Sequence, residues 1–203
     1  MHVKGLELPA HDPRAYFSSA ISYATANRGA CHLAGLTHGL ESVLSVPELG
    51  YAQPLERFES RGKGVLAARM QDLMSLFDAL KICKFLIYSG VTVDDLRRCL
   101  HLVTGRDMDL ETFLVCGERI FTLKRLYNVR CGVRAADDRL PARILEPLPE
   151  GGTRGQTPDM AVMLEEYYAH RQWNPDGIPS LAKAEQLGLQ WAYPNAGTLE
   201  KRA

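Results

Sequence analysis

The stretch KGVLAARMQDLMSLFDALKICK (63–84) decides the fold class of this 203-residue chain. Apolar residues recur in it at spacings of three and four, at Leu66, Met70, Leu73, Phe77 and Leu80. This spacing places them on one face of an α-helix, with polar residues such as Arg69 and Asp72 between them. The segment therefore predicts a long amphipathic helix, and Gly90 ends the region.

The flanking sequence predicts more helices and no sheet of consequence. The predicted helices are Asp12 to Thr25 with Asp12 as N-cap and Pro13 in the first turn, Thr92 to Gly105 with a Thr92/Asp95 capping box, Asp107 or Asp109 to Val129, Asp159 to Gln172, and Ser180 to Gly188. The helix predicted from Thr92 to Gly105 is expected to bury Leu96, Leu100 and Val103. Residues 134–156 are rich in Pro and Gly and predict an irregular strap. The fold class is mainly α, with one multi-helix domain over residues 1–190 and a frayed tail over 191–203.

Composition excludes several classes of function. Lys+Arg and Asp+Glu both total 24, and this balance argues against a nucleic-acid or membrane-surface partner. No apolar run is long enough to span a bilayer, and the N-terminus does not resemble a signal peptide. We therefore expect a cytoplasmic protein.

The five cysteines do not form a recognisable site among themselves. They lie at least 15 residues apart, without a CxxC pair, at Cys31, Cys83, Cys99, Cys116 and Cys131. This spacing argues against a disulfide scaffold and against a self-contained zinc or iron–sulfur site. Most of these thiols are expected to be buried as small hydrophobic groups.

The first candidate site is Asn27-Arg28-Gly29-Ala30-Cys31-His32. A glycine beside Arg and His at a helix end lets backbone approach a phosphate or pterin-type ligand, which Arg28 would pair with. His32 could transfer protons. The alternative is a helix C-terminus with a glycine stop and a surface arginine.

The second candidate is Asp78-Ala79-Leu80-Lys81-Ile82-Cys83-Lys84. Asp78 and Cys83 are five residues apart and would not share a face of a regular helix, so the backbone must unwind if both touch one ligand. Lys81 and Lys84 would favour the thiolate that metals require. The alternative is a core cysteine beside a surface aspartate.

Other polar groups are interpreted as having no site role. We expect the neighbouring carboxylates Asp137-Asp138 and Glu165-Glu166 to be solvated, and His38, His101 and His170 to be unassociated. Without further information, the residues predict a helical domain with two unusual segments.

Those two segments, together with others in the same order, resemble the aldehyde:ferredoxin oxidoreductase family. The segments that carry the resemblance are VKGLELPAHDPR (3–14), SYATANRGACHL (22–33), DALKICKF (78–85), TGRDM (104–108), GERIFTLKRLYNVR (117–130), LPARILEPLP (140–149), LEEYYAHRQWNPDGIP (164–179) and KAEQLGL (183–189). They span residues 3 to 189, and the resemblance implies the helical C-terminal domain of such an enzyme.

The family resemblance implies oxidation of a small aldehyde to a carboxylic acid with ferredoxin as the electron acceptor. The implied cofactors are a tungsten or molybdenum ion held by two pterins and a [4Fe-4S] cluster. Arg28 and Gly29 would lie at the pterin with Asp78, and Ile82 would contribute backbone. Cys83 would be the last of four cluster ligands, and His32 the catalytic residue near the metal. A hydrophobic groove lined by Arg28, His32, Asp78 and Cys83 would support a docking surface for the missing part.

The chain also departs from the family pattern. Ala34 stands where the family often has a basic residue that helps to hold the cofactor. The N-terminal domains that complete both cofactor sites are not in this sequence, so we expect inactivity unless missing domains or a separately encoded subunit supply them. The surface that would pack on them is expected to be apolar and exposed. Two alternatives stay open. One is a non-catalytic remnant or split-gene fragment that serves as a helical interaction module, and the other is a subunit of a related tungsten enzyme with another substrate.

Overall fold

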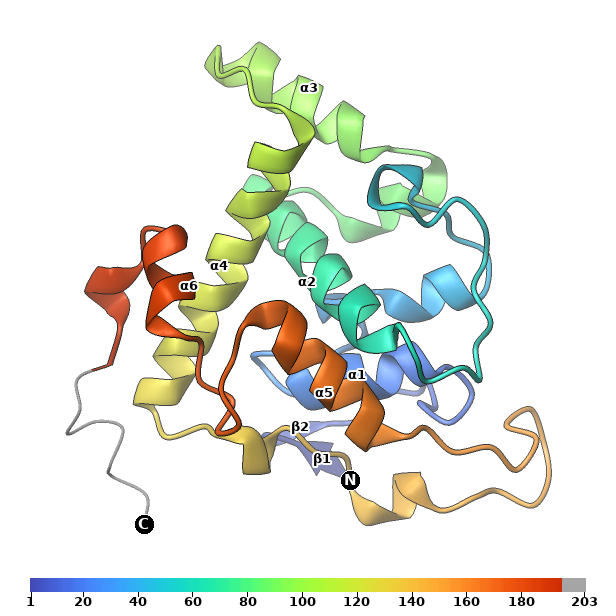
Figure 1. Ribbon diagram of the computed structural model, residues 1–203. Coiled ribbons are helices and arrows are strands. Elements are labelled where there is room, and N and C mark those ends of the chain that lie inside the picture. The colour runs from blue at the N-terminus through green and yellow to red at the C-terminus, as the bar shows by residue number, and fades with distance from the viewer. Residues whose placement is uncertain (195–203) are drawn as a thin grey trace.

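A computed structural model describes residues 1–194 and confirms the mainly α fold (Figure 1). Helix α2 (Lys63–Leu80) lies at the centre and packs against α1 (Phe17–Thr25), α4 (Leu110–Arg130) and α5 (Met160–Arg171). Its predicted apolar face is buried from Leu66 to Phe77. The intervening Asp72 is also buried because Arg171 of α5 pairs with it at 2.6 Å. The helix is therefore enclosed on more sides than an amphipathic pattern predicts.

The predicted helix starts agree with the structure at four positions. Thr92 and Asp95 form the predicted capping box of α3 (Val93–Thr104), and Gly105 ends that helix with a positive φ. Asp109, Asp159 and Ser180 cap α4, α5 and α6 (Leu181–Gln186) through their side chains. Local side-chain chemistry therefore sets these boundaries.

The predicted start of the first helix is wrong. Helix α1 begins at Phe17, and its N-cap residue Tyr16 makes no side-chain capping bond. The Asp12 carboxylate instead accepts hydrogen bonds from the backbone and guanidinium of Arg14, at 2.9 and 2.8 Å. This pairing holds residues 12–15 in turns ahead of the helix.

Helix α3 projects from the body of the molecule at its C-terminal end (Figure 1). Leu96 is buried as predicted, whereas Leu100 is only partly buried and Val103 is 85% exposed. The prediction of burial was wrong for Val103 because nothing in residues 1–194 packs over this end of α3. Leu102 beside it is also exposed.

Short elements connect the helices. They are the antiparallel strands β1 (His2–Val3) and β2 (Leu6–Glu7), and the 3₁₀ helices η1 (His32–Ala34), η2 (Thr37–Glu41), η3 (Pro47–Leu49), η4 (Lys84–Ser89), η5 (Ala135–Asp137), η6 (Ala142–Leu145) and η7 (Gln190–Ala192). Residues 134–156 form the predicted irregular strap. Element η7 crosses the predicted boundary at residue 190 and packs on α4, with Ala192 buried. The rest of the predicted tail, from residue 195, lies outside the described residues.

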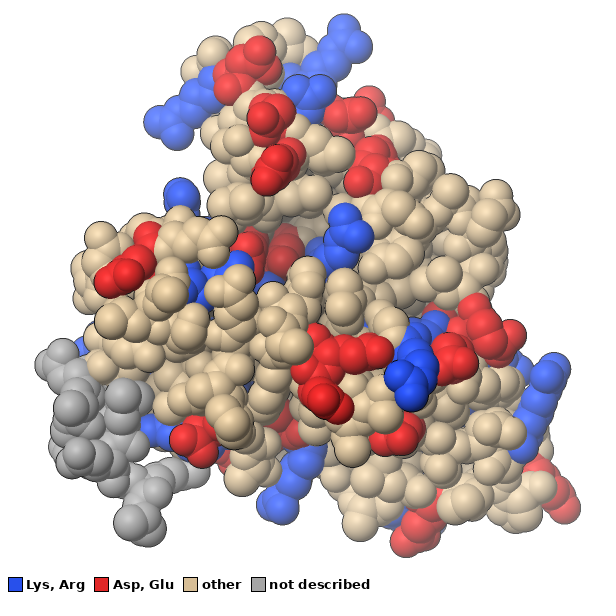
Figure 2. Space-filling view, viewed as in Figure 1, with Lys and Arg blue, Asp and Glu red and all other residues tan. Residues whose placement is uncertain are grey.

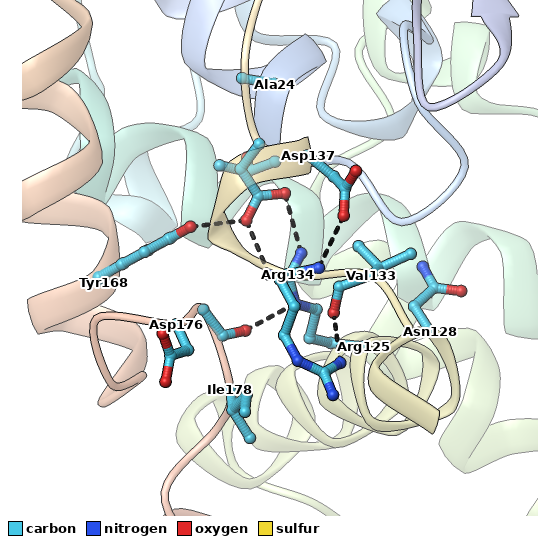
Figure 3. A network of polar contacts seen from close by, with 12 residues as sticks. Ala24, Arg125, Asn128, Val133, Arg134, Asp137, Tyr168, Asp176 and Ile178 are labelled. Atoms are coloured by element: carbon cyan, nitrogen blue, oxygen red, sulfur yellow. Dashed lines mark hydrogen bonds and ion pairs between the residues drawn. The ribbon is translucent and has the colours of Figure 1, made fainter. Parts of the chain in front are cut away.

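Asp138 is not solvated, and that prediction was wrong. Its carboxylate accepts hydrogen bonds from Arg125 at 2.9 and 2.7 Å and from Tyr168 at 2.7 Å. Figure 3 labels the two donors, Arg125 and Tyr168. Lys4 pairs with the same carboxylate at 2.6 Å. This buried network ties the N-terminal hairpin, α4 and α5 together and makes the scaffold rigid around the site described below.

The distribution of charged side chains on the surface agrees with the equal numbers of acidic and basic residues in the sequence. Acidic and basic side chains are intermingled on the face in Figure 2 rather than gathered by sign. Among residues 1–194, no helix has both the length and the apolarity required to cross a bilayer.

Candidate functional site

A cavity of about 600 Å³ lies between the C-terminal end of α2, the segment after α1, and α4. Its lining combines basic, amide and aromatic side chains, at Asn27, Arg28, Cys31, Ala34, Ser75, Asp78, Lys84, Phe121, Leu123, Lys124, Tyr127, Asn128, Arg130, Trp191 and Ala192. The cavity brings the two candidate segments together, since Arg28 belongs to the first and Asp78 to the second.

The end of α2 has the geometry that the second segment requires. The helix stops at Leu80, and Lys81 takes up a left-handed conformation with φ of 60°. The backbone therefore leaves the helix after Leu80, before it reaches Cys83, as shared contact of Asp78 and Cys83 with one ligand would require. Asp78 is held beside the cavity by Lys84, whose ammonium lies 2.9 Å from its carboxylate.

Lys84 connects the second segment to the first. Besides pairing with Asp78, it donates a hydrogen bond to the carbonyl of Leu33 at 2.9 Å. Leu33 precedes Ala34, where the family often has a basic side chain, and both Ala34 and Lys84 line the cavity. The ammonium of Lys84 thus supplies a positive charge close to the position where Ala34 lacks one.

Asn27 provides an unsatisfied acceptor in the cavity wall. Its side-chain amide donates to the carbonyl of Phe121 at 3.1 Å, and its backbone carbonyl accepts from Asn128 at 2.6 Å. Its Oδ1 atom is buried and has no hydrogen-bond partner among the described residues. A buried acceptor of this kind costs free energy unless a ligand or water donates to it.

The charges of the lining favour an anionic ligand. Four basic side chains, at Arg28, Lys84, Lys124 and Arg130, line the cavity with a single carboxylate, that of Asp78. Tyr127 and Trp191 add aromatic surface that is 66% and 73% exposed. Cationic groups, an unpaired acceptor and apolar walls together fit a phosphate-bearing heteroaromatic group such as a pterin.

Gly29 is not among the residues that line the cavity. It has a φ of +92°, and a Cβ atom there would lie 2.1 Å from the carbonyl oxygen of Val3. The absence of a side chain is therefore explained by close packing against β1. Its contact with a cofactor remains a prediction.

His32 also lies away from the cavity lining, although Cys31 and Ala34 on either side belong to it. Its imidazole ring packs against His11, with ring centroids 4.9 Å apart. His11 in turn stacks on His38 at 4.5 Å. The prediction that His38 is unassociated was wrong, because the fold brings three separate segments to this cluster.

Cys83 is exposed, directly before η4. Ile82 beside it is partly buried against the core and donates its backbone N–H to Phe77. The prediction that most thiols are buried was wrong, because Cys31 is buried whereas Cys83, Cys99 and Cys131 are exposed and Cys116 is partly buried. Within residues 1–194 no three His, Cys, Asp or Glu side chains are placed to hold a metal ion. A [4Fe-4S] cluster needs four thiolates, so the chain fits this group only as the donor of one ligand.

Sequence reasoning missed the contribution of α4 to the cavity. Lys124, Tyr127 and Asn128 share one face of that helix at spacings of three and four. The segment GERIFTLKRLYNVR carries all three, but their polarity alone is equally typical of a solvated helix face.

Comparisons with known proteins match the chain over almost its full length. The family model for aldehyde ferredoxin oxidoreductase, domains 2 and 3, matches residues 1–189. A tungsten-containing aldehyde ferredoxin oxidoreductase of Pyrococcus furiosus is 39% identical over 95% of this chain, and that of Thermococcus kodakarensis is 39% identical over 93%. The WOR-like subunit of an aliphatic sulfonate oxidoreductase of Pyrococcus furiosus is 26% identical over the whole chain.

The chain spans only part of each relative, 31% of the length of the two aldehyde ferredoxin oxidoreductases and 30% of the sulfonate oxidoreductase subunit. The family match and the two 39% identities, extending over nearly all of the chain, support one assignment. The chain belongs to the aldehyde ferredoxin oxidoreductase family of tungsten-containing oxidoreductases.

Proposed function

We propose that this chain is the C-terminal, cofactor-contacting part of a tungstopterin oxidoreductase that converts aldehydes to carboxylic acids and passes electrons to ferredoxin. The observation that carries the proposal is the cavity in which Arg28 and Asp78 converge beside the unpaired Oδ1 of Asn27. Tungsten held by pterins would supply the two-electron chemistry, and a [4Fe-4S] cluster would carry the electrons onward.

The roles of this chain's own residues follow from their chemistry. Arg28 and Lys84 would pair with phosphate or ring oxygens of the pterin, and Asp78 and Asn27 would accept hydrogen bonds from its N–H groups. Cys83 would donate one thiolate to the cluster. His32 would accept a proton during aldehyde oxidation.

The other part of the enzyme would come from missing N-terminal domains or from a separate subunit. The exposed apolar side chains of η4, at Phe85, Leu86 and Tyr88, follow Cys83 directly. Such a surface suits contact with the polypeptide that supplies the three remaining thiolates. On this proposal the chain alone is inactive.

A second substrate class has specific support. The relative from the aliphatic sulfonate oxidoreductase matches the entire chain, which the aldehyde enzymes do not quite do. Its 26% identity is lower than their 39%, so we propose aldehyde oxidation first and oxidation of another small substrate second.

The test is metal and pterin analysis of the chain expressed anaerobically, alone and with the part of the Pyrococcus furiosus relative that it does not match. We expect about four irons and one tungsten per complex, with iron lost in Cys83→Ser and retained in the matched control Cys99→Ser. Asp78→Asn should lower the pterin content measured by fluorescence after release. A complex that forms but contains neither metal would disprove the proposal and leave a non-catalytic helical module.

A further inference from the structure

The fold places three histidines from different segments in one cluster beside the candidate site. His11 precedes α1, His32 begins η1 and His38 lies in η2. His11 is the central member, with ring centroids 4.9 Å from His32 and 4.5 Å from His38, while His32 and His38 are 6.1 Å apart. His38 also meets the edge of Tyr16 at 6.2 Å.

The geometry of the cluster does not suit a shared metal ion. The rings of His11 and His38 are stacked with an interplanar angle of 21°, so their nitrogens lie in nearly parallel planes rather than converging on one point. This agrees with the lack of a metal-binding group among residues 1–194. The arrangement of the three rings instead suits a role in proton transfer.

We propose that His11 and His38 are positioning residues that hold His32 in its neutral, proton-accepting form. This inference rests on the proposed function, in which His32 accepts a proton. A hydrated aldehyde that becomes a carboxylic acid loses two electrons and two protons. A bound tungsten centre and cluster would take up the electrons, and the protons require a base that is still unprotonated at neutral pH.

Three imidazoles at these separations cannot all carry a proton without strong repulsion between like charges. The same packing removes water from the rings. The Nδ1 atom of His38 is buried and has no hydrogen-bond partner among the described residues. Partial burial, then the charges of His11 and Arg28, lower the pKa of His32. The pKa of His38 is lowered to about 4, mainly by burial and further by the electrostatic effects of His11 and His32.

The groups that face the cluster reinforce this effect. They are Tyr16, whose ring lies 6.2 Å from that of His38, and Arg28, whose charge acts on His32. Asp12 is the nearest carboxylate in sequence, and Arg14 binds both of its oxygens. Its charge is thereby neutralised and does little to favour a protonated imidazole. The charge of Arg28 favours the neutral form of His32.

The experiment is an NMR titration of the histidine ring resonances in the full chain, compared with His11→Phe and His11→Gln. Phe keeps an aromatic ring against His38 without a charge, and Gln keeps polarity if Phe perturbs the fold. We expect the pKa of His32 to rise by about half a unit or more in either variant, because the electrostatic effect of His11 on His32 is removed. His101→Phe, on exposed α3, is the matched control and should leave it unchanged. An unaltered His32 pKa in both His11 variants would overturn the proposal.

A second arm uses the loaded complex. The acidic limb of its rate–pH profile should move upward in His11→Phe by the same amount as the His32 pKa, and a profile that stays in place would rule out a role in proton transfer. A purely structural role of His11 would change the overall rate without moving the limb. Absence of tungsten and iron from the complex would refute the proposed function while leaving the NMR result intact, so the two failures are distinguishable.

Discussion

At the scale of single residues, the environment of a side chain separates groups that look alike in sequence. Asp137 and Asp138 are neighbours, yet Asp138 is 1% exposed and its carboxylate is held by Arg125, Lys4 and Tyr168. Burial alone would raise the pKa of Asp138, but the charges of Arg125 and Lys4 outweigh it and lower that pKa. The carboxylate is therefore ionised in the folded protein at neutral pH.

We expect Asp138→Asn to lower the free energy of unfolding by about 3–5 kcal/mol, because it leaves two buried cations without their counter-charge. Urea denaturation measures this, with the exposed Glu165→Gln as the control that should change stability by less than about 0.5 kcal/mol. A loss for Asp138→Asn as small as that of the control would mean that the network contributes little.

The pH dependence of stability should show the effects of the lowered pKa values of Asp138 and His38. Because the folded pKa of Asp138 is lowered, its contribution is present above the unfolded value of about 3.9 and is lost as the pH falls through the folded value. The folded pKa of His38 is also lowered, to about 4, so the unfolded chain binds a proton more tightly. Stability should therefore begin to fall already between about pH 6.5 and 4. Thermal melts of His38→Phe should show a smaller first decline, because His32, whose pKa is also lowered, still contributes to it. A decline of equal size would contradict the assignment to His38.

At the scale of elements, the crossing of α2 and α4 is set by one glycine. A Cβ atom at Gly117 would lie 2.3 Å from the carbonyl oxygen of Asp72, so the two helix backbones are in direct contact. This approach positions the α4 face with Lys124 and Tyr127 over the end of α2 and so forms the cavity wall. Glycine here serves packing despite its low helix propensity.

Gly117→Ala should therefore destabilise the protein by on the order of 2 kcal/mol, since overpacking outweighs the gain in helix propensity. The control is Gly152→Ala, where a Cβ atom would meet nothing within 4 Å. Urea denaturation of both variants checks the prediction. An alanine at 117 that stabilises the protein would show that α4 can shift without cost.

At the scale of the whole molecule, the N-terminal hairpin links the scaffold to the site. Lys4 donates to the carbonyl of Ala24 in α1 and pairs with Asp138, while the backbone of Val3 packs against Gly29. The segment Asn27 to His32 is thus held from behind by the hairpin. The positions of Arg28 and His32 therefore depend on Val3 and Lys4 in the N-terminal hairpin.

Lys4→Ala should loosen this link. We expect faster hydrogen exchange in the hairpin and around Gly29, with a loss of about 1–3 kcal/mol in global stability because the buried carboxylate loses a partner. Glu7→Ala, at an exposed position of β2, is the control. Exchange around Gly29 that remains at the wild-type rate would show that the hairpin does not support the site.

The sequence by itself determined the helical class, the caps at Thr92, Asp109, Asp159 and Ser180, and the family, because these depend on local periodicity, side-chain-to-backbone hydrogen bonds and ordered motifs. It also predicted that the backbone must unwind between Asp78 and Cys83 if both contact one ligand. Only the tertiary structure decided that Asp138 is buried, that α3 projects, that Lys84 bonds to the carbonyl of Leu33 beside Ala34, and that His32 and His38 both pack against His11. These outcomes depend on contacts between segments far apart in the chain, and the residue types involved are equally compatible with a solvated surface.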